Sequence, residues 1–437
     1  MYLQRKIDTE LENWKDLPQR KPLMLRGARQ VGKSSSVKNL SKQFQYFVEI
    51  NFEENPNYQA IFDKGLTPIE ICEQLAVVTN TPIISGKTLL FFDEIQSCLP
   101  AISSLRYFYE KLPDLHLIAA GSLLEFALAE LPSFGVGRIR SIFMFPFSFE
   151  EFLLAFKENS LLKVLDKATP EQTIPDIIHQ KLKKYLKKFL IIGGMPEAVN
   201  SYVANGDLLE VQRVLEDLTQ SIEVDFAKYK NRVSTAKIRE VFNAVVQQVG
   251  NKFTYSYPNA TLNNIQIKEA LELLTLAGLV FPVTHSACNG IPLGAEINVK
   301  KRKFLIFDTG IFQRILGLNI SELLIEDDFN VINKGNIAEL FVGLELLKNT
   351  PPYEKKDLYY WQREAKNSQA EVDYIIQKQE KIVPIEVKAG TKGTMQSLYI
   401  FLDEKKIDEG IRVSLENFSA INHVKIYPLY AVKKIVS

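Results

Sequence analysis

The octapeptide GARQVGKS, at residues 27–34, is the feature that most constrains how this chain can fold. It follows the pattern G-x-x-x-x-G-K-[ST], in which a buried strand leads into a glycine-rich loop and then a helix. The flanking sequence fits, because PLMLR precedes the loop as a strand candidate and SSSVKNLSKQF follows it as a helix candidate. The pattern therefore predicts a phosphate-binding loop at the carboxyl end of a strand in a parallel sheet.

Each part of this loop has a physical role in holding a nucleoside triphosphate. Gly27 and Gly32 let the backbone turn, so that successive N–H groups and the amino end of the next helix point at the β-phosphate. Lys33 brings a positive charge to the β- and γ-phosphates, and the Ser34 hydroxyl reaches Mg²⁺. We therefore expect ATP and Mg²⁺ as cofactors. The expected nucleotide-binding residues are Gly27, Ala28, Arg29, Gln30, Val31, Gly32, Lys33, Ser34 and Ser35.

A second motif, TLLFFDE at residues 88–94, ends an apolar run in two acidic residues. Asp93 would hold Mg²⁺ through its water shell, and Glu94 would polarise the attacking water as a general base. An acidic pair at a strand end, taken alone, is more often a helix start or a solvated turn. Together with the loop, it indicates ATP hydrolysis, with Lys33 and Glu94 as catalytic residues.

Two further catalytic candidates follow later strands. Ser122 ends LHLIAAGS, at the edge of the sheet where open α/β folds bind ligands, and would sense the γ-phosphate. A simple turn is the alternative. Arg138 or Arg140, before the last apolar strand, would stabilise transition-state charge across a subunit interface, which would require self-association. A surface salt bridge is the alternative for either arginine.

Composition sets the broad class of the protein. A chain of 437 residues is expected to form about three domains. Hydrophobic residues make up 46% and charged residues 24%, which is typical of a folded globular protein. The net charge of +1 gives no overall attraction to nucleic acid or membrane, so either partner would have to meet a local patch.

Cysteine usage and hydropathy bear on the compartment. Cys72, Cys98 and Cys288 lie far apart, so they offer neither a disulfide framework nor a CxxC metal site. The four histidines show no ligand spacing for zinc. No apolar run approaches the roughly 18 residues that a membrane span needs. We therefore expect a cytoplasmic protein with no membrane partner.

Changes in the pattern of apolar and polar residues divide the chain into five segments. Short apolar runs that alternate with helix-like stretches predict a parallel α/β core, whereas helical periodicity dominates the middle of the chain. Helices followed by a hairpin suggest a winged-helix-like domain, and a helix followed by several strands suggests a separate α/β domain. The predicted segments are an amino-terminal helix (1–20), the ATPase core (21–150), a helical lid (151–235), the winged-helix-like domain (236–327) and the tail domain (328–437).

The order of several motifs carries a family resemblance. GARQVGKS, FFDEIQ, AAGS, GR followed by FPFSFEEF, and GGMPE at residues 193–197 resemble prokaryotic AAA+ ATPases with a carboxy-terminal restriction-endonuclease-like domain. The resemblance spans nearly the whole chain. It implies an α/β fold with a three-layer P-loop AAA+ core, a helical lid, a winged-helix segment and a restriction-endonuclease-like α/β tail.

The resemblance also implies roles for single residues. Lys33 and Ser34 match the first Walker motif, Asp93 and Glu94 the second, and Ser122 the first sensor. The family usually has Thr followed by Thr-Leu after the lysine, whereas this chain has three serines; serine can ligate Mg²⁺ as well. GGMPE marks the family, and its paired glycines indicate a tight break between helices.

The tail contains a set of acidic residues and a lysine that would suit a nuclease. Asp373 lies in EVDYII, and Glu386 and Lys388 lie on one face of the strand PIEVK, with Glu339 on the preceding helix. The carboxylates would hold one or two Mg²⁺ or Mn²⁺ ions, and Lys388 would help activate water for phosphodiester cleavage. This resembles the PD-(D/E)XK signature, with Val372 in place of its proline. A solvated Glu/Lys strand face is the alternative.

Two functions remain open from sequence alone. The first is a Mg²⁺-dependent ATP-hydrolysing protein whose ATP state is coupled to a nuclease-like domain that engages DNA or RNA. Basic clusters at residues 181–188 and 300–303 could contact nucleic acid, or could be a solvated helix face and a hairpin turn. The second is a nucleotide-dependent switch whose tail is a non-cleaving platform that binds protein or DNA.

Overall fold

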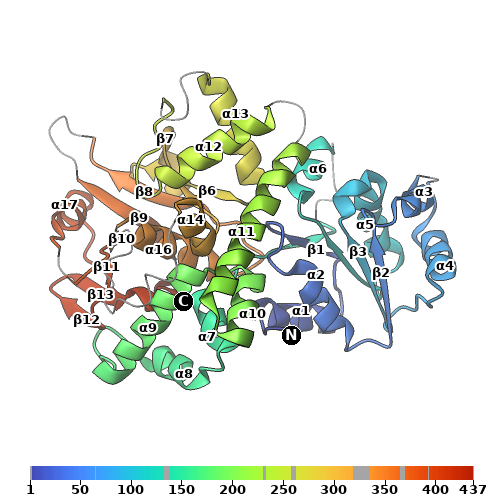
Figure 1. Ribbon diagram of the computed structural model, residues 1–437, viewed down its shortest axis with the longest axis horizontal. Coiled ribbons are helices and arrows are strands. Elements are labelled where there is room, and N and C mark those ends of the chain that lie inside the picture. The colour runs from blue at the N-terminus through green and yellow to red at the C-terminus, as the bar shows by residue number, and fades with distance from the viewer. Residues whose placement is uncertain are drawn as a thin grey trace. The chain divides into compact units, whose positions relative to one another are not determined.

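The computed structural model describes most of the chain, and this part forms two compact units (Figure 1). Unit 1 contains Met1–Phe145 with two short later segments, Leu276–Gly278 and Pro351–Lys355, and unit 2 contains the remainder. The described residues are 2–63, 65–131, 137–229, 233–256, 262–317, 335–364, 370–391 and 393–436.

A five-stranded parallel sheet forms the centre of unit 1, in the order β2-β3-β4-β1-β5. Every residue of β3 and β4 is buried, as expected for strands covered on both faces. All five strands match apolar runs in the sequence, which confirms an α/β fold with a parallel central sheet. The strands are β1 (Leu23–Arg26), β2 (Tyr46–Asn51), β3 (Thr88–Asp93), β4 (His116–Ala120) and β5 (Arg140–Phe143).

Helices connect the strands of unit 1 and cover the sheet. A capping box between Thr67 and Glu70, with a proline in the first turn, fixes the start of α4. The helices are α1 (Lys6–Asp16), α2 (Lys33–Ser41), α3 (Gln59–Phe62), α4 (Pro68–Thr79), α5 (Leu99–Lys111) and α6 (Leu124–Glu130), with short 3₁₀ turns at Pro56–Tyr58 and Ile95–Ser97.

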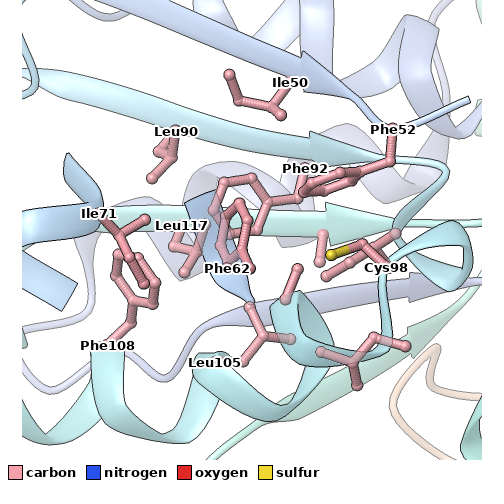
Figure 2. Close-up of a cluster of buried hydrophobic side chains, with 14 of the residues drawn as sticks. Ile50, Phe52, Phe62, Ile71, Leu90, Phe92, Cys98, Leu105, Phe108 and Leu117 are labelled. Carbon is pink, nitrogen blue, oxygen red and sulfur yellow. The ribbon is translucent and has the colours of Figure 1, made fainter. Parts of the chain in front are cut away.

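One face of this sheet packs against α3, α4 and α5 through a cluster of aromatic and aliphatic side chains (Figure 2). Phe92 of β3 lies at its centre. Its ring makes edge-to-face contacts with Phe52, Phe62 and Phe108, at centroid distances of 5.8, 5.5 and 6.0 Å. Such contacts add to the hydrophobic burial, and they hold the strand that carries the acidic pair.

His116, the first residue of β4, is buried and couples the stability of unit 1 to pH. The His116 ring lies edge-on to Trp14 and Phe44, and its Nε2 is 3.1 Å from the Lys15 carbonyl oxygen. Burial, assisted by Arg20, lowers the pKa of His116 to about 4. The folded protein therefore keeps this ring neutral at a pH where the unfolded chain protonates it.

We expect this difference to destabilise unit 1 in mild acid. Above about pH 6.5 the ring is neutral in both the folded and the unfolded chain, so it does not lower the free energy of unfolding of unit 1. As the pH falls towards 4, protonation of the unfolded chain lowers this free energy by about 3 kcal/mol. Urea unfolding followed by Trp14 fluorescence, in a Trp361→Phe background, should show a shallower pH dependence over this range for His116→Gln. Equal slopes for the two proteins would contradict this prediction.

An eight-stranded mixed sheet lies in unit 2, in the order β12-β13-β11-β10-β9-β8-β6-β7. The hairpin β6–β7 joins the tail strands because β6 pairs in parallel with β8, with Val283 opposite Leu358. The strands are β6 (Val280–Ser286), β7 (Ile297–Ile306), β8 (Leu358–Gln362), β9 (Glu371–Lys378), β10 (Lys381–Val387), β11 (Gly410–Ser414), β12 (Ser419–Ile421) and β13 (Val424–Pro428).

This sheet crosses a boundary that the sequence places between the winged-helix-like segment and the tail. The hairpin belongs to segment 236–327 and the other strands to segment 328–437, yet they form one sheet. The pairing of β6 with β8 has no local sequence signal, because it joins strands far apart in the chain. The boundary itself, between residues 327 and 328, lies outside the described residues.

Helices make up most of the rest of unit 2, and only the last residue of α13, Leu276, belongs to unit 1. The segment expected to form a lid, residues 151–235, contains α8 to α11. The helices are α7 (Phe149–Ala155), α8 (Asn159–Lys167), α9 (Asp176–Ile192), α10 (Pro196–Asn205), α11 (Leu208–Asp225), α12 (Thr235–Gln247), α13 (Asn264–Leu276), α14 (Thr309–Ile315), α16 (Asn336–Lys348), α17 (Gln396–Lys405) and α18 (Lys433–Val436). Short 3₁₀ turns lie at Phe226–Lys228, Leu293–Glu296 and Leu429–Ala431.

The GGMPE segment has a structural explanation in the junction between α9 and α10. Gly193 has a φ of +78°, and a Cβ there would lie 2.2 Å from Asp308 Oδ1; a Cβ on Gly194 would lie 2.3 Å from the Phe147 carbonyl oxygen. The buried Asp308 carboxylate accepts hydrogen bonds from the N–H groups of Gly194, Gly310 and Ile311, at 2.7, 2.9 and 3.1 Å. The two glycines thus let Asp308 join this junction to the start of α14.

Candidate functional site

The phosphate-binding loop lies between β1 and α2, as the sequence predicts. Gly27 and Gly32 have φ values of +143° and +98°, and a side chain on Gly27 would collide with the Met144 carbonyl oxygen at 2.1 Å. Gln30 also has a positive φ, +62°, a strained conformation of the kind that concentrates at functional sites. Gly32 is the N-cap of α2 and has no side chain, so the first N–H groups of α2 remain available to an anion.

Lys33 is buried, and its amine lies over the loop itself. Nζ donates to the carbonyl oxygens of Gly27 and Ala28, at 3.0 and 2.8 Å. Burial lowers the pKa of Lys33 to about 8, although the carboxylates of Glu94 and Asp93 oppose the shift. An anion bound in the loop would raise the pKa of Lys33 again, because a nearby negative charge stabilises the protonated amine.

Ser34 and Asp93 meet at the carboxyl end of the sheet. The Ser34 hydroxyl donates to Asp93 Oδ2 at 2.7 Å. Asp93 is buried, and burial raises its pKa, while the Ser34 hydrogen bond opposes that rise. Two hard oxygen donors beside a phosphate loop fit Mg²⁺, which prefers one or two protein ligands together with waters and phosphate oxygens.

Glu94 is held by groups from two neighbouring strand ends. Because β4 pairs with β3, Ser122 after β4 lies beside Glu94 after β3. Glu94 Oε2 accepts from Gln96 Nε2 at 2.6 Å and from the Ser122 hydroxyl at 3.2 Å. Glu94 itself adopts a left-handed conformation with φ +48°, another strained position. The structure therefore brings Lys33, Ser34, Asp93, Glu94 and Ser122 to one edge of one sheet.

Gln96 is a residue that the sequence interpretation missed. Its amide holds Glu94, and a Cβ on Gly121 would lie 2.0 Å from Gln96 Oε1, so the glycine before Ser122 makes room for this side chain. Its place two residues after Glu94, in FFDEIQ, was the available signal. A 3₁₀ turn at Ile95–Ser97 directs the side chain back toward Glu94.

Arg138 is placed away from these interactions. Its guanidinium forms an ion pair with Glu110 of α5 at 2.5 Å, and both side chains are about half exposed or less. This is the surface salt bridge that the sequence left as an alternative. A role for Arg138 in another subunit's site stays a prediction.

The acidic residues of the tail come together, but around a lysine that the sequence interpretation did not include. Lys303 Nζ lies 2.8 Å from Glu339 Oε1, 2.5 Å from Glu371 Oε1 and 4.0 Å from Asp373 Oδ1. Burial alone would lower the pKa of Lys303, but the three carboxylates, Glu339 foremost, raise it above its ordinary value. Burial raises the pKa of Glu339, and Lys303 opposes that rise.

The other two predicted tail residues pair with each other. Lys388 Nζ lies 2.6 Å from Glu386 Oε1, and the Val387 N–H donates to Asp373 Oδ2 at 2.7 Å. In the part of the chain that the structure describes, no group of three or more His, Cys, Asp or Glu side chains is arranged to hold a metal ion. The expected second Mg²⁺ or Mn²⁺ site therefore does not fit the tail residues as they are arranged.

Lys303 was missed because it stands in the basic run KKRK, which looks like a solvated hairpin turn. The burial of β7 changes along its length, so that Lys303 begins the buried half of the strand. In the other basic cluster, on α9, Lys181 pairs with Glu158 and Lys187 is buried. Neither cluster is a uniform basic face.

No helix among the described residues is both long enough and apolar enough to span a bilayer.

Comparison with known families finds an AAA domain over residues 19–153. Two domains of unknown function match further along, DUF8612 over residues 183–322 and DUF4143 over residues 334–432. No curated protein sequence matches the chain.

Among solved structures, the chain is similar to a Walker-type ATPase of Pyrococcus abyssi, with 16% identity and a TM-score of 0.46 over 72% of this chain and 96% of that one. It also matches the Orc1 protein of Aeropyrum pernix in complex with DNA, with 12% identity and a TM-score of 0.26 over 74% and 93% of the two chains. Similarities this distant carry no information about the activity of this chain.

The AAA match covers the phosphate loop, the acidic pair, Ser122 and Arg138. It supports the ATPase part of the family resemblance, and with it ATP binding and hydrolysis. The tail matches only a domain of unknown function, so its restriction-endonuclease-like character stays a prediction.

Proposed function

We propose that unit 1 hydrolyses ATP with the help of Mg²⁺, and that its nucleotide state controls how unit 2 engages nucleic acid. The observation that carries the first part is the pair of hydrogen bonds at the edge of the sheet, Ser34 to Asp93 and Ser122 to Glu94. These contacts support a role for Ser34 and Asp93 in binding Mg²⁺ and for Glu94 as the general base.

The residues of the loop would bind and orient the triphosphate. The first N–H groups of α2 would donate to oxygens of the β-phosphate, and Lys33 would exchange the carbonyl oxygens of Gly27 and Ala28 for β- and γ-phosphate oxygens. Mg²⁺ bound by Ser34 and Asp93 would neutralise part of the negative charge of the phosphates. The exchange at Lys33 replaces weak neutral acceptors by charged ones, so nucleotide binding is favoured.

Glu94 would orient the attacking water and accept its proton. Ser122 and Gln96 hold one carboxylate oxygen, Oε2, and thereby fix the direction of the other. A base that is held in place avoids the cost of reorganisation during the reaction.

Arg138 is the proposed residue for transition-state charge, supplied to a neighbouring subunit. Its half-exposed guanidinium would have to exchange Glu110 for a phosphate. Comparison of Arg138→Ala with Glu110→Ala tests this role. A loss of kcat in Arg138→Ala alone supports it, whereas equal effects assign Arg138 to the ion pair.

The course of the chain supports coupling between nucleotide state and unit 2. Two short segments of unit 1 come from within the sequence of unit 2. One of them places Gly278 next to the loop residue Ala28, and the other accepts a hydrogen bond from the Phe143 N–H at Pro352, 2.7 Å. A change in the loop on ATP binding would reach the chain leading into β6 and β8 through these segments.

The experiment for the coupling is ATP turnover measured with and without nucleic acid. The proposal predicts that duplex or single-stranded DNA, or RNA, raises kcat several-fold, and that the increase disappears at high salt because phosphate contacts are screened. Turnover that no nucleic acid changes, in a preparation that does hydrolyse ATP, would count against engagement of nucleic acid and leave the ATPase proposal standing.

A second candidate function is favoured by the position of Lys303. An ammonium in the middle of the tail carboxylates favours a nucleotide-dependent switch whose unit 2 binds protein or DNA without cleaving. Nuclease assays on the wild type and on Asp373→Asn separate the two. Cleavage that is lost in Asp373→Asn supports a nuclease, and nucleic-acid binding without cleavage in either protein supports the platform.

A further inference from the structure

We propose that Lys303 is a built-in cation of the tail, and that its ammonium takes the place a divalent metal ion would occupy among Glu339, Glu371 and Asp373. These four residues form what we call the lysine–acid cluster. Metal binding and the present position of Lys303 would then exclude each other.

The geometry of the lysine–acid cluster is the first argument. Its three acidic residues come from two elements, α16 and β9, and Lys303 enters from β7. The ammonium contacts Glu339 and Glu371 at hydrogen-bond distance and lies 4.0 Å from Asp373. Carboxylates are the ligands that hard divalent cations prefer, but only two of these three oxygens lie close to Nζ, so the described residues are arranged for an ammonium and not for a metal ion. Here a side chain of the protein supplies the positive charge instead.

The burial of Lys303 is the second argument. Its side chain is 2% exposed, and an ammonium removed from water is stable only when it is paired and hydrogen-bonded. The Tyr360 ring, 5.3 Å from Nζ, adds a cation–π contact. The Tyr374 hydroxyl donates to the Glu339 carbonyl oxygen at 2.7 Å and fixes the end of α16 that carries Glu339. The cluster is therefore built around the lysine.

An unused acceptor beside the cluster is the third argument. Glu386 is 5% exposed, and among the described residues its Oε2 has no hydrogen-bond partner, although Oε1 pairs with Lys388. A buried carboxylate oxygen without a partner carries the full cost of its desolvation. A divalent ion bound to Asp373 could take this oxygen as a further ligand, whereas the ammonium of Lys303, which pairs with Glu339 and Glu371, leaves it without a partner among the described residues. The orphaned oxygen is what is left when a lysine stands in for the metal.

The lysine–acid cluster is partly exposed to solvent. The exposed fraction rises from 2% at the Lys303 side chain to 18% at Asp373 and 29% at Glu371. A cation could therefore enter if the ammonium were removed. All four residues lie in unit 2, so the inference does not depend on ATP hydrolysis.

Mn²⁺ binding to the full chain without nucleotide tests the proposal, with free Mn²⁺ measured by electron paramagnetic resonance. An Asp93→Asn background removes the candidate site in unit 1. Here the background protein should bind Mn²⁺ weakly at the tail, Lys303→Met should bind about one ion at least tenfold more tightly, and further Asp373→Asn should abolish the gain. Lys301→Met, on the same strand but paired with Glu364, is the matched control and should gain nothing.

Two results would overturn the proposal. One is a folded Lys303→Met protein, judged by circular dichroism, that gains no Mn²⁺ site. The other is tight Mn²⁺ binding by the background protein that Asp373→Asn removes, since Lys303 would then not exclude the metal. The comparison of the Asp93→Asn background with and without Asp373→Asn leaves Lys303 unchanged. It therefore tests whether Lys303 excludes the metal even if Lys303→Met fails to fold. Its opposite result, weak binding unchanged by Asp373→Asn, supports the proposal.

Discussion

Replacement of Glu94 by Gln is expected to lower kcat for ATP hydrolysis by roughly 10²–10⁴-fold, the usual contribution of a general base. The amide keeps the shape of the side chain and can still accept hydrogen bonds from Gln96 and Ser122. It cannot accept a proton from water. ATP affinity should therefore stay within a few-fold of the wild type, because the loop and Lys33 are unchanged.

Single-turnover hydrolysis and equilibrium ATP binding, measured on the same preparations, separate the two effects. Glu73→Gln is the matched control, since Glu73 lies exposed on α4, and it should turn over like the wild type. A Glu94→Gln protein that keeps more than about a tenth of the wild-type kcat would remove Glu94 from the role of base.

Replacement of Asp308 by Ala is expected to lower the free energy of unfolding of unit 2 by ~3–5 kcal/mol, because three buried N–H groups lose their acceptor. These groups belong to Gly194, Gly310 and Ile311, so the junction after α9 and the start of α14 lose their common anchor. Urea unfolding followed by Trp361 fluorescence, in a Trp14→Phe background, measures the change.

Two controls accompany this variant. Asp308→Asn keeps an acceptor oxygen and should recover part of the loss. Asp403→Ala removes a carboxylate whose side chain is 87% exposed, and it should change stability by less than about 0.5 kcal/mol. A loss below about 1 kcal/mol in Asp308→Ala would show that Asp308 does not hold the junction.

The core of unit 1 could be predicted from sequence because its signals are local. Glycines with positive φ, a lysine and serine at the start of α2, and apolar runs that end in Asp93 or in Ser122 each identify one strand end. In a parallel sheet all these ends meet at one edge, so the residues converge once the strands are recognised. Gln96 was not predicted as a site residue, because a glutamine after an acidic pair has no distinctive chemistry until its contact with Glu94 is known.

The tail was predicted less completely because its decisive contacts are not local. The pairing of β6 with β8 brings a hairpin from one expected domain into the sheet of another. Lys303 then reaches Glu339 and Glu371, residues that no sequence spacing connects with it. Three of the acidic residues were predicted from sequence, Glu339, Asp373 and Glu386. Lys303, which pairs with Glu339, was not predicted, because nothing distinguishes it within a run of four basic residues.

The burial of polar residues was likewise invisible in the sequence. Asp308 and Lys303 look like surface residues by type, and such residues are rarely buried unless they are paired. The partners of Asp308 come from the junction between α9 and α10 and from α14, and those of Lys303 come from α16 and β9. The order of elements predicted a hairpin in this segment, but not that Lys303 lies in the buried part of one of its strands.

The most direct test of the central claim is the rate of phosphate release from ATP by the wild-type chain, measured in Mg²⁺ and in EDTA beside Lys33→Ala. The proposed function predicts turnover in Mg²⁺, loss of turnover in EDTA, and loss of both ATP binding and turnover in Lys33→Ala. A wild-type chain that binds ATP with Mg²⁺ but releases no phosphate, or a Lys33→Ala chain that hydrolyses ATP at the wild-type rate, would contradict it.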